Sequence, residues 1–249
     1  MKPSALRFQQ VVKRHAHGTV LAGVELDIAP GECFGLVGVN GAGKTSLIKC
    51  LLDFCAVDAG SIDIFGVSHR LPQARRRLAF LPEHFAPPYY LSGAGFLKYV
   101  LSLHGARHDP AAVLAMLAAL DLDAQALTRT VRGYSKGMTQ KLGLAACLLA
   151  NKDAYVLDEP MSGLDPKARA LLKIQLQQLR ARGSSVFFTS HALADVEQMC
   201  DRMAILHAGT IHFVGTPAEC CLLFGAASLE QAFMNCIEPG PACISPILA

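Results

Sequence analysis

Residues 38–46 of this chain are Gly38-Val39-Asn40-Gly41-Ala42-Gly43-Lys44-Thr45-Ser46. They fit the pattern Gly-x-x-x-x-Gly-Lys-Ser/Thr, in which glycines let the backbone bend so that successive N–H groups point at a bound phosphate. The preceding run Phe34-Gly35-Leu36-Val37 predicts a buried strand, and the apolar spacing from Ser46 to Phe54 predicts a helix. The stretch therefore predicts a phosphate site at a helix N-terminus, where unpaired N–H groups and the helix dipole favour anions.

Two side chains of this loop carry expected roles. Lys44 is the expected contact to the β- and γ-phosphates of a nucleotide, and the Thr45 hydroxyl is the expected magnesium ligand. A glycine-rich turn that leads into an ordinary helix is the alternative, and the motif alone leaves it open. The rest of the chain has to decide between the two.

The composition narrows the class of protein. The chain has 249 residues, 52% of them apolar, and a net charge of +3. No apolar run approaches the roughly 18 residues of a membrane span, and the N-terminus has no apolar segment typical of a secretory signal. The weak, interspersed charge does not indicate a nucleic-acid partner. The cysteines form no C-x-x-C pair, and His15-Ala16-His17 offers too few ligands for a metal site.

Buried and half-buried strands recur along the chain. Ala5 to Val12 and Val20 to Ile28 read as strands, and the second alternates apolar and acidic residues as a half-solvated antiparallel strand does. Further short strands are predicted around Ile62 and Ile64 and at residues 78–81, the second ending at Pro82. The alternation therefore predicts that residues 20–28 form an antiparallel strand with one face in solvent.

The apolar spacing then becomes helical, and further along the chain strands alternate with helices. From about Leu97 to Leu149, Ala-rich periodic segments predict a helical insert, interrupted at residues 105–110 and 128–135. From Asp153 onward, strands at residues 154–157 and 186–189 alternate with helices, which predicts a parallel sheet covered on both faces. A hairpin is expected around Ala208-Gly209, and the tail from Glu238 is expected to be mobile.

Two adjacent acids follow one of the buried strands. Asp158 and Glu159 come directly after residues 154–157, and ligand groups gather at the carboxyl ends of parallel strands, which predicts Asp158 beside the phosphate loop. One acid can hold magnesium, and the other can orient or deprotonate an attacking water. A strand end followed by an acidic helix cap is the alternative.

The segment Tyr134-Ser135-Lys136-Gly137-Met138-Thr139-Gln140 adds a specific signal. On its own, Ser135 before a long apolar helix is a good N-cap. The segment also resembles the signature sequence of the ATP-binding-cassette (ABC) ATPases, in the Tyr-Ser-Lys-Gly-Met form frequent in the exporter branch. Residues 80–83 then resemble the Q-loop, residues 162–166 the D-loop, Ser190-His191 the switch histidine, and residues 228–233 a C-terminal segment of exporter ATPases. The likeness covers about residues 5–235.

The resemblance implies a fold and a domain organisation. We expect an α/β fold: a P-loop NTPase core with a mostly parallel sheet, an N-terminal antiparallel β subdomain and an inserted α-helical subdomain. Residues 1–237 would form one nucleotide-binding domain, with the helical subdomain at about 84–149, and residues 238–249 a flexible tail.

The resemblance also implies a mechanism with ATP and Mg2+. Two copies would meet head to tail as a homodimer, with each ATP between residues 38–46 of one copy and the signature of the other, residues Ser135, Lys136, Gly137 and Met138. Glu159 would be the catalytic base, with Lys44 and the γ-phosphate sensor His191 also catalytic. Asp158 would act beside the magnesium, and Asp165 belongs to the D-loop. The dimer would drive an integral membrane permease from the cytoplasmic face of the membrane.

Two positions depart from the family pattern. Glu83 stands where the Q-loop usually has Gln, and because a carboxylate still ligates a hard cation, we expect function to persist with altered metal or coupling behaviour. His15, in Lys13-Arg14-His15, corresponds best to the aromatic residue that stacks on adenine. Its smaller ring predicts weaker discrimination between adenine and guanine.

Several alternatives stay open. The aromatic stretch from Phe85 to Leu91, with Phe96 and Tyr99, either packs the insert onto the sheet or, by resemblance, receives a helix of the permease. The leading function is an exporter ATPase. The alternative is a regulatory or assembly module that dimerises with ATP without moving a substrate. The cargo is not encoded here, because selectivity would reside in the permease.

Overall fold

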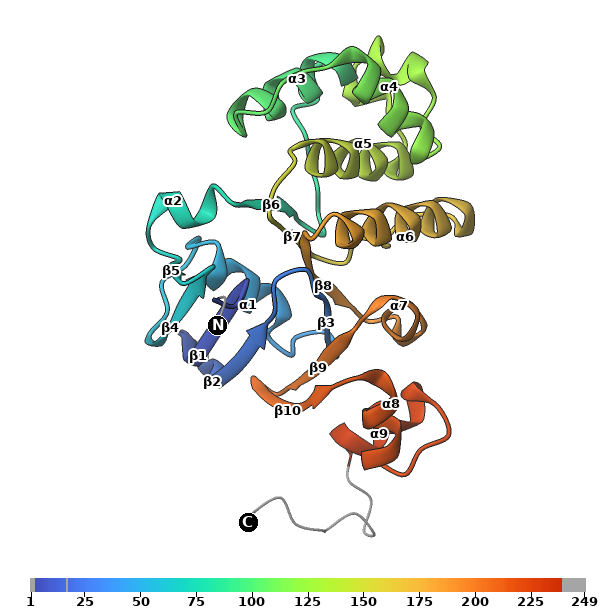
Figure 1. Cartoon of the computed structure of the whole chain (residues 1–249). Coiled ribbons are helices and arrows are strands. Elements are labelled where there is room, and N and C mark those ends of the chain that lie inside the picture. The colour runs from blue at the N-terminus through green and yellow to red at the C-terminus, as the bar shows by residue number, and fades with distance from the viewer. Residues whose placement is uncertain (1–2, 17, 239–249) are drawn as a thin grey trace. The chain divides into compact units, whose positions relative to one another are not determined.

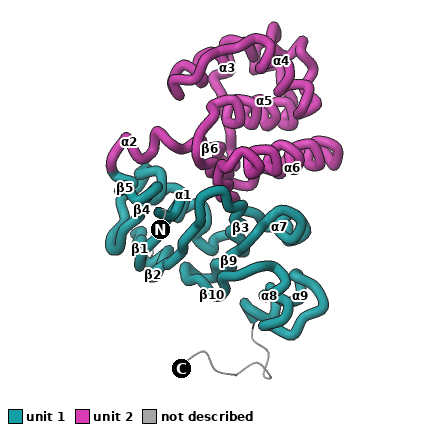
Figure 2. The backbone as a smooth tube through the Cα atoms, viewed as in Figure 1, with its two compact units in different colours: residues 1–70, 189–249 teal, residues 71–188 magenta. Residues whose placement is uncertain are grey.

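The computed structural model describes residues 3–16 and 18–238, and the expected tail lies outside them from residue 239 onward. The chain divides into two compact units. One consists of residues 1–70 and 189–249, and the other of residues 71–188 (Figure 2). The first unit is therefore discontinuous in sequence.

The N-terminal part of the first unit is an antiparallel sheet (Figure 1). Its strand order is β2 (Gly18–Ile28), β1 (Leu6–His15), β4 (Ala59–Ile64) and β5 (Val67–Ser68). Leu6 pairs with Ile28 on one side and with Ile64 on the other. In β2, Val24, Leu26 and Ile28 are buried while Glu25 and Asp27 are exposed, which confirms the predicted alternation.

A second group of strands in the same unit carries the phosphate loop. Strand β3 (Cys33–Val37) pairs in parallel with β9 (Arg202–His207), and β9 forms the predicted hairpin with β10 (Thr210–Gly215). All five residues of β3 are buried. Helix α7 (Leu193–Met199) packs closely against β3, since a Cβ added at Gly35 would lie 2.7 Å from the Cys200 sulfur.

Helix α1 (Lys44–Leu51) begins inside the glycine-rich motif and ends earlier than the apolar spacing predicts. It begins there because Gly43, with φ of 112°, provides the left-handed turn and accepts the first helical hydrogen bond from the Leu47 N–H at 2.9 Å. It ends because Asp53 adopts φ of 60° and the Phe54 N–H donates back to the Lys49 carbonyl at 2.9 Å, a left-handed C-terminal turn.

The second unit contains parallel strands at its centre. Strand β7 (Ala154–Leu157) pairs in parallel with β6 (Leu78–Leu81) and with β8 (Ser185–Ser190), whose last two residues fall in the first unit. Helices α2 (Pro72–Arg75) and α6 (Pro166–Ala181) precede β6 and β8. With parallel pairs predominating and a single antiparallel hairpin at β9 and β10, the mostly parallel sheet of the expected fold class is confirmed among the described residues.

The helical insert lies in the second unit. It comprises α3 (Gly93–Leu103), α4 (Pro110–Ala119), two short 3₁₀ turns, η1 (Ala124–Leu127) and η2 (Val131–Gly133), and α5 (Lys136–Leu149). Ser92, Asp109 and Ser135 cap the three α-helices, each accepting a hydrogen bond from a first-turn N–H. The first helix starts four residues before the predicted Leu97 because Ser92 caps it.

The remaining helices, α8 (Pro217–Leu223) and α9 (Leu229–Ile237), close the described part of the first unit. The sequence did not predict α8, which is short but begins with a reciprocal cap between Thr216 and Glu219. Across residues 3–16 and 18–238, every helix is too short or too polar to span a membrane.

Candidate functional site

The loop at residues 38–46 has the backbone that its glycines predict. Gly41 and Gly43 have φ of 82° and 112°, in the left-handed region that glycine adopts without strain. The Ala42 N–H donates to the Val39 carbonyl at 3.2 Å and closes a turn. The loop thus leads from the buried strand β3 into the N-terminus of α1, the arrangement that binds phosphate in other proteins.

Lys44 is a buried cation in the middle of this loop, with only 7% of its surface exposed. Its Nζ donates to the Gly38 carbonyl at 2.6 Å and to the Val39 carbonyl at 3.3 Å. The side chain therefore curls back over the loop that precedes it. Thr45 is exposed and Ser46 is half-buried, in the first turn of α1.

The β9–β10 hairpin supports the loop from the side. The Gly209 N–H donates to the Ala42 carbonyl at 3.2 Å, and the Gly209 carbonyl accepts from the Ala22 N–H at 2.8 Å. A Cβ at Gly38 would collide with the Leu206 carbonyl, and one at Gly43 would lie 2.9 Å from the Leu21 side chain. These glycines are therefore required by close packing as well as by backbone conformation.

The two acids after β7 are both buried, Asp158 to 2% and Glu159 to 7% exposure. The Asp158 N–H continues the parallel ladder by donating to the Leu81 carbonyl at 2.9 Å. Glu159 has φ of 49°, so the chain turns sharply at this residue, and its carbonyl accepts from the Ser162 N–H at 3.0 Å. Because ligand groups gather at the carboxyl ends of parallel strands, the position of these two acids makes them a candidate for chemistry.

Glu83 comes off the same edge of the sheet as the acidic pair. Leu81 at the end of β6 pairs with Leu157 at the end of β7, so the segments that follow both strands leave at one edge. Glu83 itself is exposed. Its carboxylate and that of Asp158 therefore belong to neighbouring strand ends of the second unit.

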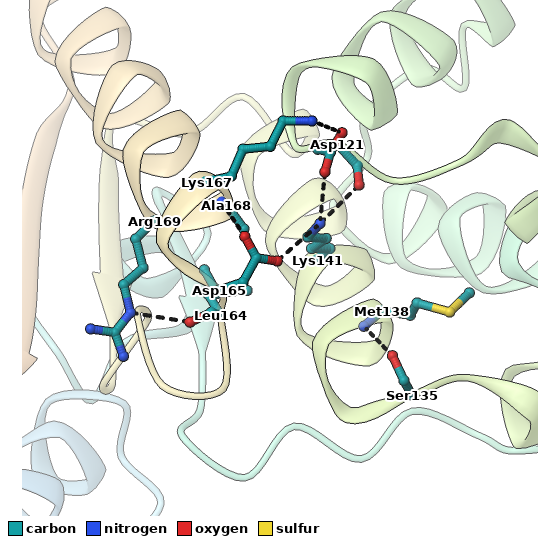
Figure 3. A network of polar contacts seen from close by, with 9 residues as sticks. All are labelled: Asp121, Ser135, Met138, Lys141, Leu164, Asp165, Lys167, Ala168 and Arg169. Carbon is teal, nitrogen blue, oxygen red and sulfur yellow. Dashed lines mark hydrogen bonds and ion pairs between the residues drawn. The ribbon is translucent and has the colours of Figure 1, made fainter.

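The predicted signature residues lie at the start of α5. Ser135 is its N-cap, and its hydroxyl accepts from the Met138 N–H at 3.2 Å (Figure 3). A Cβ added at Gly137 would lie 3.5 Å from the Gly163 carbonyl, and one at Gly163 would lie 3.1 Å from Lys136 Cε. The beginning of α5 thus packs directly against the expected D-loop.

Asp165 ends that D-loop as the N-cap of α6, and its Oδ1 accepts from the Ala168 N–H at 2.9 Å (Figure 3). This hydrogen bond, helped by the Lys141 charge, holds the pKa of the Asp165 carboxyl below its usual range. Asp121 is held in a similar way, with its pKa lowered chiefly by the hydrogen bond from Lys167. Both carboxylates therefore stay charged at neutral pH.

The two predicted histidines lie in the first unit. His15 ends β1, opposite Gly18 of β2, and its side chain is exposed. His191 follows β8 directly and is also exposed. Ser190, just before it, accepts a hydrogen bond from the Ala192 N–H at 3.0 Å and so fixes the turn on which His191 stands.

The donors available for a cation are oxygens. Thr45 supplies a hydroxyl, and Asp158 and Glu83 supply carboxylates, which are the ligand types that Mg2+ prefers. In the described ranges, no group of three or more His, Cys, Asp and Glu side chains is arranged to hold a metal by itself. Mg2+ commonly takes one or two carboxylates and completes its shell with water and substrate phosphates. Asp158 and Glu83, at neighbouring strand ends of the second unit, are carboxylates of that type.

The phenylalanines and the tyrosines of the aromatic stretch differ in burial. Phe96 is buried, and its ring contacts Phe85 edge-on with centroids 5.6 Å apart. Tyr89, Tyr90 and Tyr99 are exposed to 66%, 69% and 52%. The phenylalanines therefore pack the insert, whereas the tyrosines face outward.

Sequence reasoning missed the contacts of two polar residues in α5, the helix that begins with the predicted signature residues and is called the signature helix below. Gln140 donates to the Pro160 carbonyl at 3.3 Å, immediately after the acidic pair. Lys141 donates to the Asp121 carbonyl at 2.8 Å and faces Asp165. The available signal was the presence of Gln and Lys at the start of an otherwise apolar stretch of α5, but it names no partners.

A glycine-rich turn between a buried strand and a helix, a lysine curled into it, and a strand that ends in two buried carboxylates define an α/β protein of the phosphate-binding-loop class. The chain belongs to the ABC transporter family, whose sequence model matches residues 21–162. It carries the ATP-binding domain of that family, so ATP is the nucleotide that it binds.

Curated relatives agree with this assignment. An uncharacterised ABC transporter ATP-binding protein of Synechocystis sp. is 39% identical over 79% of this chain, and the match spans 56% of that relative's length. A Nod factor export ATP-binding protein I of Burkholderia thailandensis is 37% identical over 87% of this chain and 72% of its own length.

Solved structures share the fold. An ATP-binding subunit of an ABC transporter superposes with a TM-score of 0.86 and 28% identity, covering 94% of this chain and 99% of the other. A dimeric ATP-binding cassette in a post-hydrolysis state with ADP and Pi superposes with a TM-score of 0.78 over 85% of this chain and 98% of its own. At 19% identity the second likeness concerns the fold alone.

Proposed function

We propose that this chain hydrolyses ATP as a homodimer and thereby energises a separately encoded membrane permease that exports a substrate. The observation that carries the proposal is the buried pair Asp158 and Glu159 in a chain that also has a phosphate-binding loop and a capped signature helix. Export is favoured by the relatives named Nod factor export ATP-binding protein I. Residues 1–237 would act as one nucleotide-binding domain, with a helical subdomain at 84–149 and a tail at 238–249.

The loop at residues 38–46 would hold the phosphates through its backbone N–H groups. Lys44 would leave the Gly38 and Val39 carbonyls for the β- and γ-phosphates, exchanging one set of oxygen acceptors for another. Thr45 and Asp158, with Glu83 from the neighbouring strand end, would hold Mg2+. Bound there, Mg2+ would neutralise part of the phosphate charge. His15 would stack on the base.

Glu159 would be the general base. Its carboxylate accepts a proton from the attacking water while the water oxygen bonds to the γ-phosphorus and the bond to the bridging oxygen breaks, leaving ADP and phosphate. His191 would donate a hydrogen bond to the γ-phosphate and so sense its departure. Burial of Glu159 keeps bulk water from competing for that proton.

A second copy would complete each site. Ser135 and the Gly137 N–H, at the positive end of α5, would donate to the γ-phosphate held by the partner's loop, with Lys136 and Met138 flanking them. The two copies would therefore be related head to tail. Hydrolysis removes the phosphate that both copies share, so the dimer would open.

The permease would bind at the exposed tyrosines of the insert, and the chain would lie on the cytoplasmic face of the membrane through that contact. Tyr89, Tyr90 and Tyr99 offer large amphipathic side chains of the kind enriched at protein interfaces. The transported substrate would be selected by the permease.

The decisive test is Glu159→Gln, which keeps the shape of the side chain and removes its basicity. We expect hydrolysis to fall by at least about 10²-fold while ATP binding is retained, and we expect sedimentation to detect an ATP-dependent dimer. An unimpaired turnover rate would remove Glu159 from its role. Co-purification with a soluble partner alone, and never with a multi-span membrane protein, would favour the regulatory module instead.

A further inference from the structure

Lys141 is a buried cation in the signature helix that has no role in the chemistry described so far. Its side chain is 11% exposed, and it bridges two segments far away in sequence (Figure 3). Nζ donates to the Asp121 carbonyl at 2.8 Å and lies 3.6 Å from the Asp121 carboxylate. It also lies 3.9 Å from the Asp165 carboxylate, at the end of the D-loop.

The two carboxylate oxygens of Asp165 contact different groups. Oδ1 caps α6 by accepting from the Ala168 N–H at 2.9 Å, and Oδ2 is the atom that faces Lys141. The position of this carboxylate therefore fixes where the D-loop ends and α6 begins. Since Lys141 belongs to α5, the ion pair links the D-loop to the signature helix.

Asp121 anchors the other side of Lys141. It follows α4 with φ of 54°, a left-handed turn that presents its carbonyl to the Lys141 ammonium. Its Oδ1 binds Lys167 of α6 at 2.7 Å, while its Oδ2 faces Lys141. The four side chains thus form a row of alternating charge, Asp165, Lys141, Asp121 and Lys167, whose net charge is zero. The row connects α5, the start of α6 and the turn that follows α4.

The signature helix and the proposed D-loop also touch at a second point, near the start of α5. Gly137 lies beside the Gly163 carbonyl, and the Lys136 chain runs over Gly163. The start of α5 and the D-loop are therefore joined at Gly163 and again at Asp165. A shift of one at either point would move the other.

We propose that Lys141 is a positioning residue for the trans half of the ATP site: it holds Asp165, and through it the D-loop, in fixed register with the signature residues at the start of α5. The inference rests on the proposed function, because the D-loop and signature act only when two copies close on ATP. Removing the Lys141 charge loosens the D-loop while the phosphate loop, which lies in the other unit, stays intact.

The test uses the full chain with Glu159→Gln, to which Lys141→Met, Lys141→Arg or Lys152→Met is added. Lys152→Met is the matched control, because Lys152 Nζ also donates to a carbonyl at the end of a helix, that of His104 at 2.9 Å, while Lys152 itself lies between α5 and β7, outside the proposed D-loop. The dimer Kd is measured by sedimentation in saturating MgATP. Thermal unfolding and ATP binding to the dilute monomer are measured for every variant.

We expect Lys141→Met to raise the dimer Kd by about threefold to twentyfold, because a partly exposed ion pair is worth up to about fivefold in an equilibrium constant and a dimer holds two. Lys141→Arg, which keeps the charge, should stay within about threefold, and Lys152→Met within about twofold. Monomer ATP binding should be unchanged. Adding Lys141→Met to Asp165→Asn, which keeps the cap oxygen, should cause no further loss.

Equal dimer Kd values for Lys141→Met and Lys152→Met would overturn the positioning role, as would failure of Lys141→Arg to restore dimerisation. An additive loss in the double variant would mean that Lys141 does not act through Asp165. If Glu159→Gln alone never dimerises with ATP, the proposed function itself fails, and that outcome is visible before any change at Lys141.

Discussion

Lys44 has a setting that a surface lysine does not have. Its ammonium is almost fully buried, and its Nζ contacts are to the loop's own Gly38 and Val39 carbonyls. A buried ammonium is costly unless it is hydrogen-bonded, and carbonyl acceptors can be exchanged for phosphate oxygens. This setting supports the proposed contact between Lys44 and the phosphates of the nucleotide.

Replacing Lys44 with Met tests this at the level of one side chain. Hydrogen bonds to charged groups are worth about 1.5–3 kcal/mol, so ATP affinity should fall by about tenfold to a hundredfold. Equilibrium dialysis with ATP measures the affinity. Lys49→Met, an exposed lysine on the same helix, is the control and should leave ATP affinity unchanged. Equal affinities for both variants would contradict the role of Lys44.

At the scale of single elements, two helix caps allow an effect on stability to be distinguished from an effect on ATP binding. Ser92 and Ser135 perform the same structural task, because each hydroxyl accepts from the N–H three residues ahead, at 3.1 and 3.2 Å. Only Ser135 is proposed to bind ATP. The chain thus contains its own comparison for a capping serine.

We expect Ser92→Ala and Ser135→Ala each to lower the free energy of unfolding by about 1 kcal/mol, the usual cost of losing an N-cap. Urea denaturation measures this. In the Glu159→Gln background, only Ser135→Ala should weaken the ATP-driven dimer. If Ser92→Ala weakens the dimer as much, the effect of Ser135 would be one of helix stability rather than nucleotide contact.

Helix α8 provides a pH test. The Glu219 Oε2 accepts from the Thr216 N–H at 2.7 Å, and this hydrogen bond lowers the pKa of Glu219 below its ordinary 4.5. A carboxyl whose pKa is lowered on folding stabilises the fold above its unfolded pKa and loses that contribution as the pH falls through the folded pKa.

The stability difference between the unmodified chain and Glu219→Gln should therefore be constant above about pH 5 and shrink as the pH falls below about 4.5. Urea denaturation at several pH values from 3 to 6 checks the trend. Glu197→Gln, at an exposed position in α7, is the control. A difference that grows towards low pH would contradict the lowered pKa.

At the scale of the whole molecule, the proposed site residues are divided between the two compact units. The phosphate loop, His15 and His191 belong to the discontinuous first unit, while the acidic pair, the signature and the D-loop belong to residues 71–188. The exposed tyrosines also lie in the second unit. The surface proposed for the permease thus belongs to the same unit as Glu159, the proposed general base.

We expect Tyr89→Ala to weaken association with the membrane partner by about tenfold or more, because an aromatic anchor at an interface commonly contributes about 2 kcal/mol. The association is measured by co-expressing the chain with a hydrophobic six-span protein encoded by a neighbouring gene. The two proteins are then co-purified from detergent. Leu222→Ala, at a side chain 81% exposed in the other unit, is the control. Equal loss for both variants would place the partner's contact elsewhere.

The sequence by itself determined the phosphate loop, the buried strand ahead of it, the strand that ends in Asp158 and Glu159, and the cap at Ser135. These features are local: glycine permits left-handed turns, apolar periodicity reports burial, and a serine before an apolar helix caps it. Element ends were less accurate where side chains outside the periodic run decided them, as Ser92 does for α3 and Asp53 does for α1.

Only the tertiary structure decided which distant residues meet. Lys141 and Asp121, Gln140 and Pro160, and Gly38 and Leu206 are pairs whose members lie far apart along the chain. A lysine has the same sequence signal whether its ammonium points to water or to a carboxylate, because the partner is supplied by packing rather than by neighbouring residues. For that reason the phosphate loop was predictable from the sequence, whereas the ion-pair network that joins α5 to Asp165 and Asp121 was not.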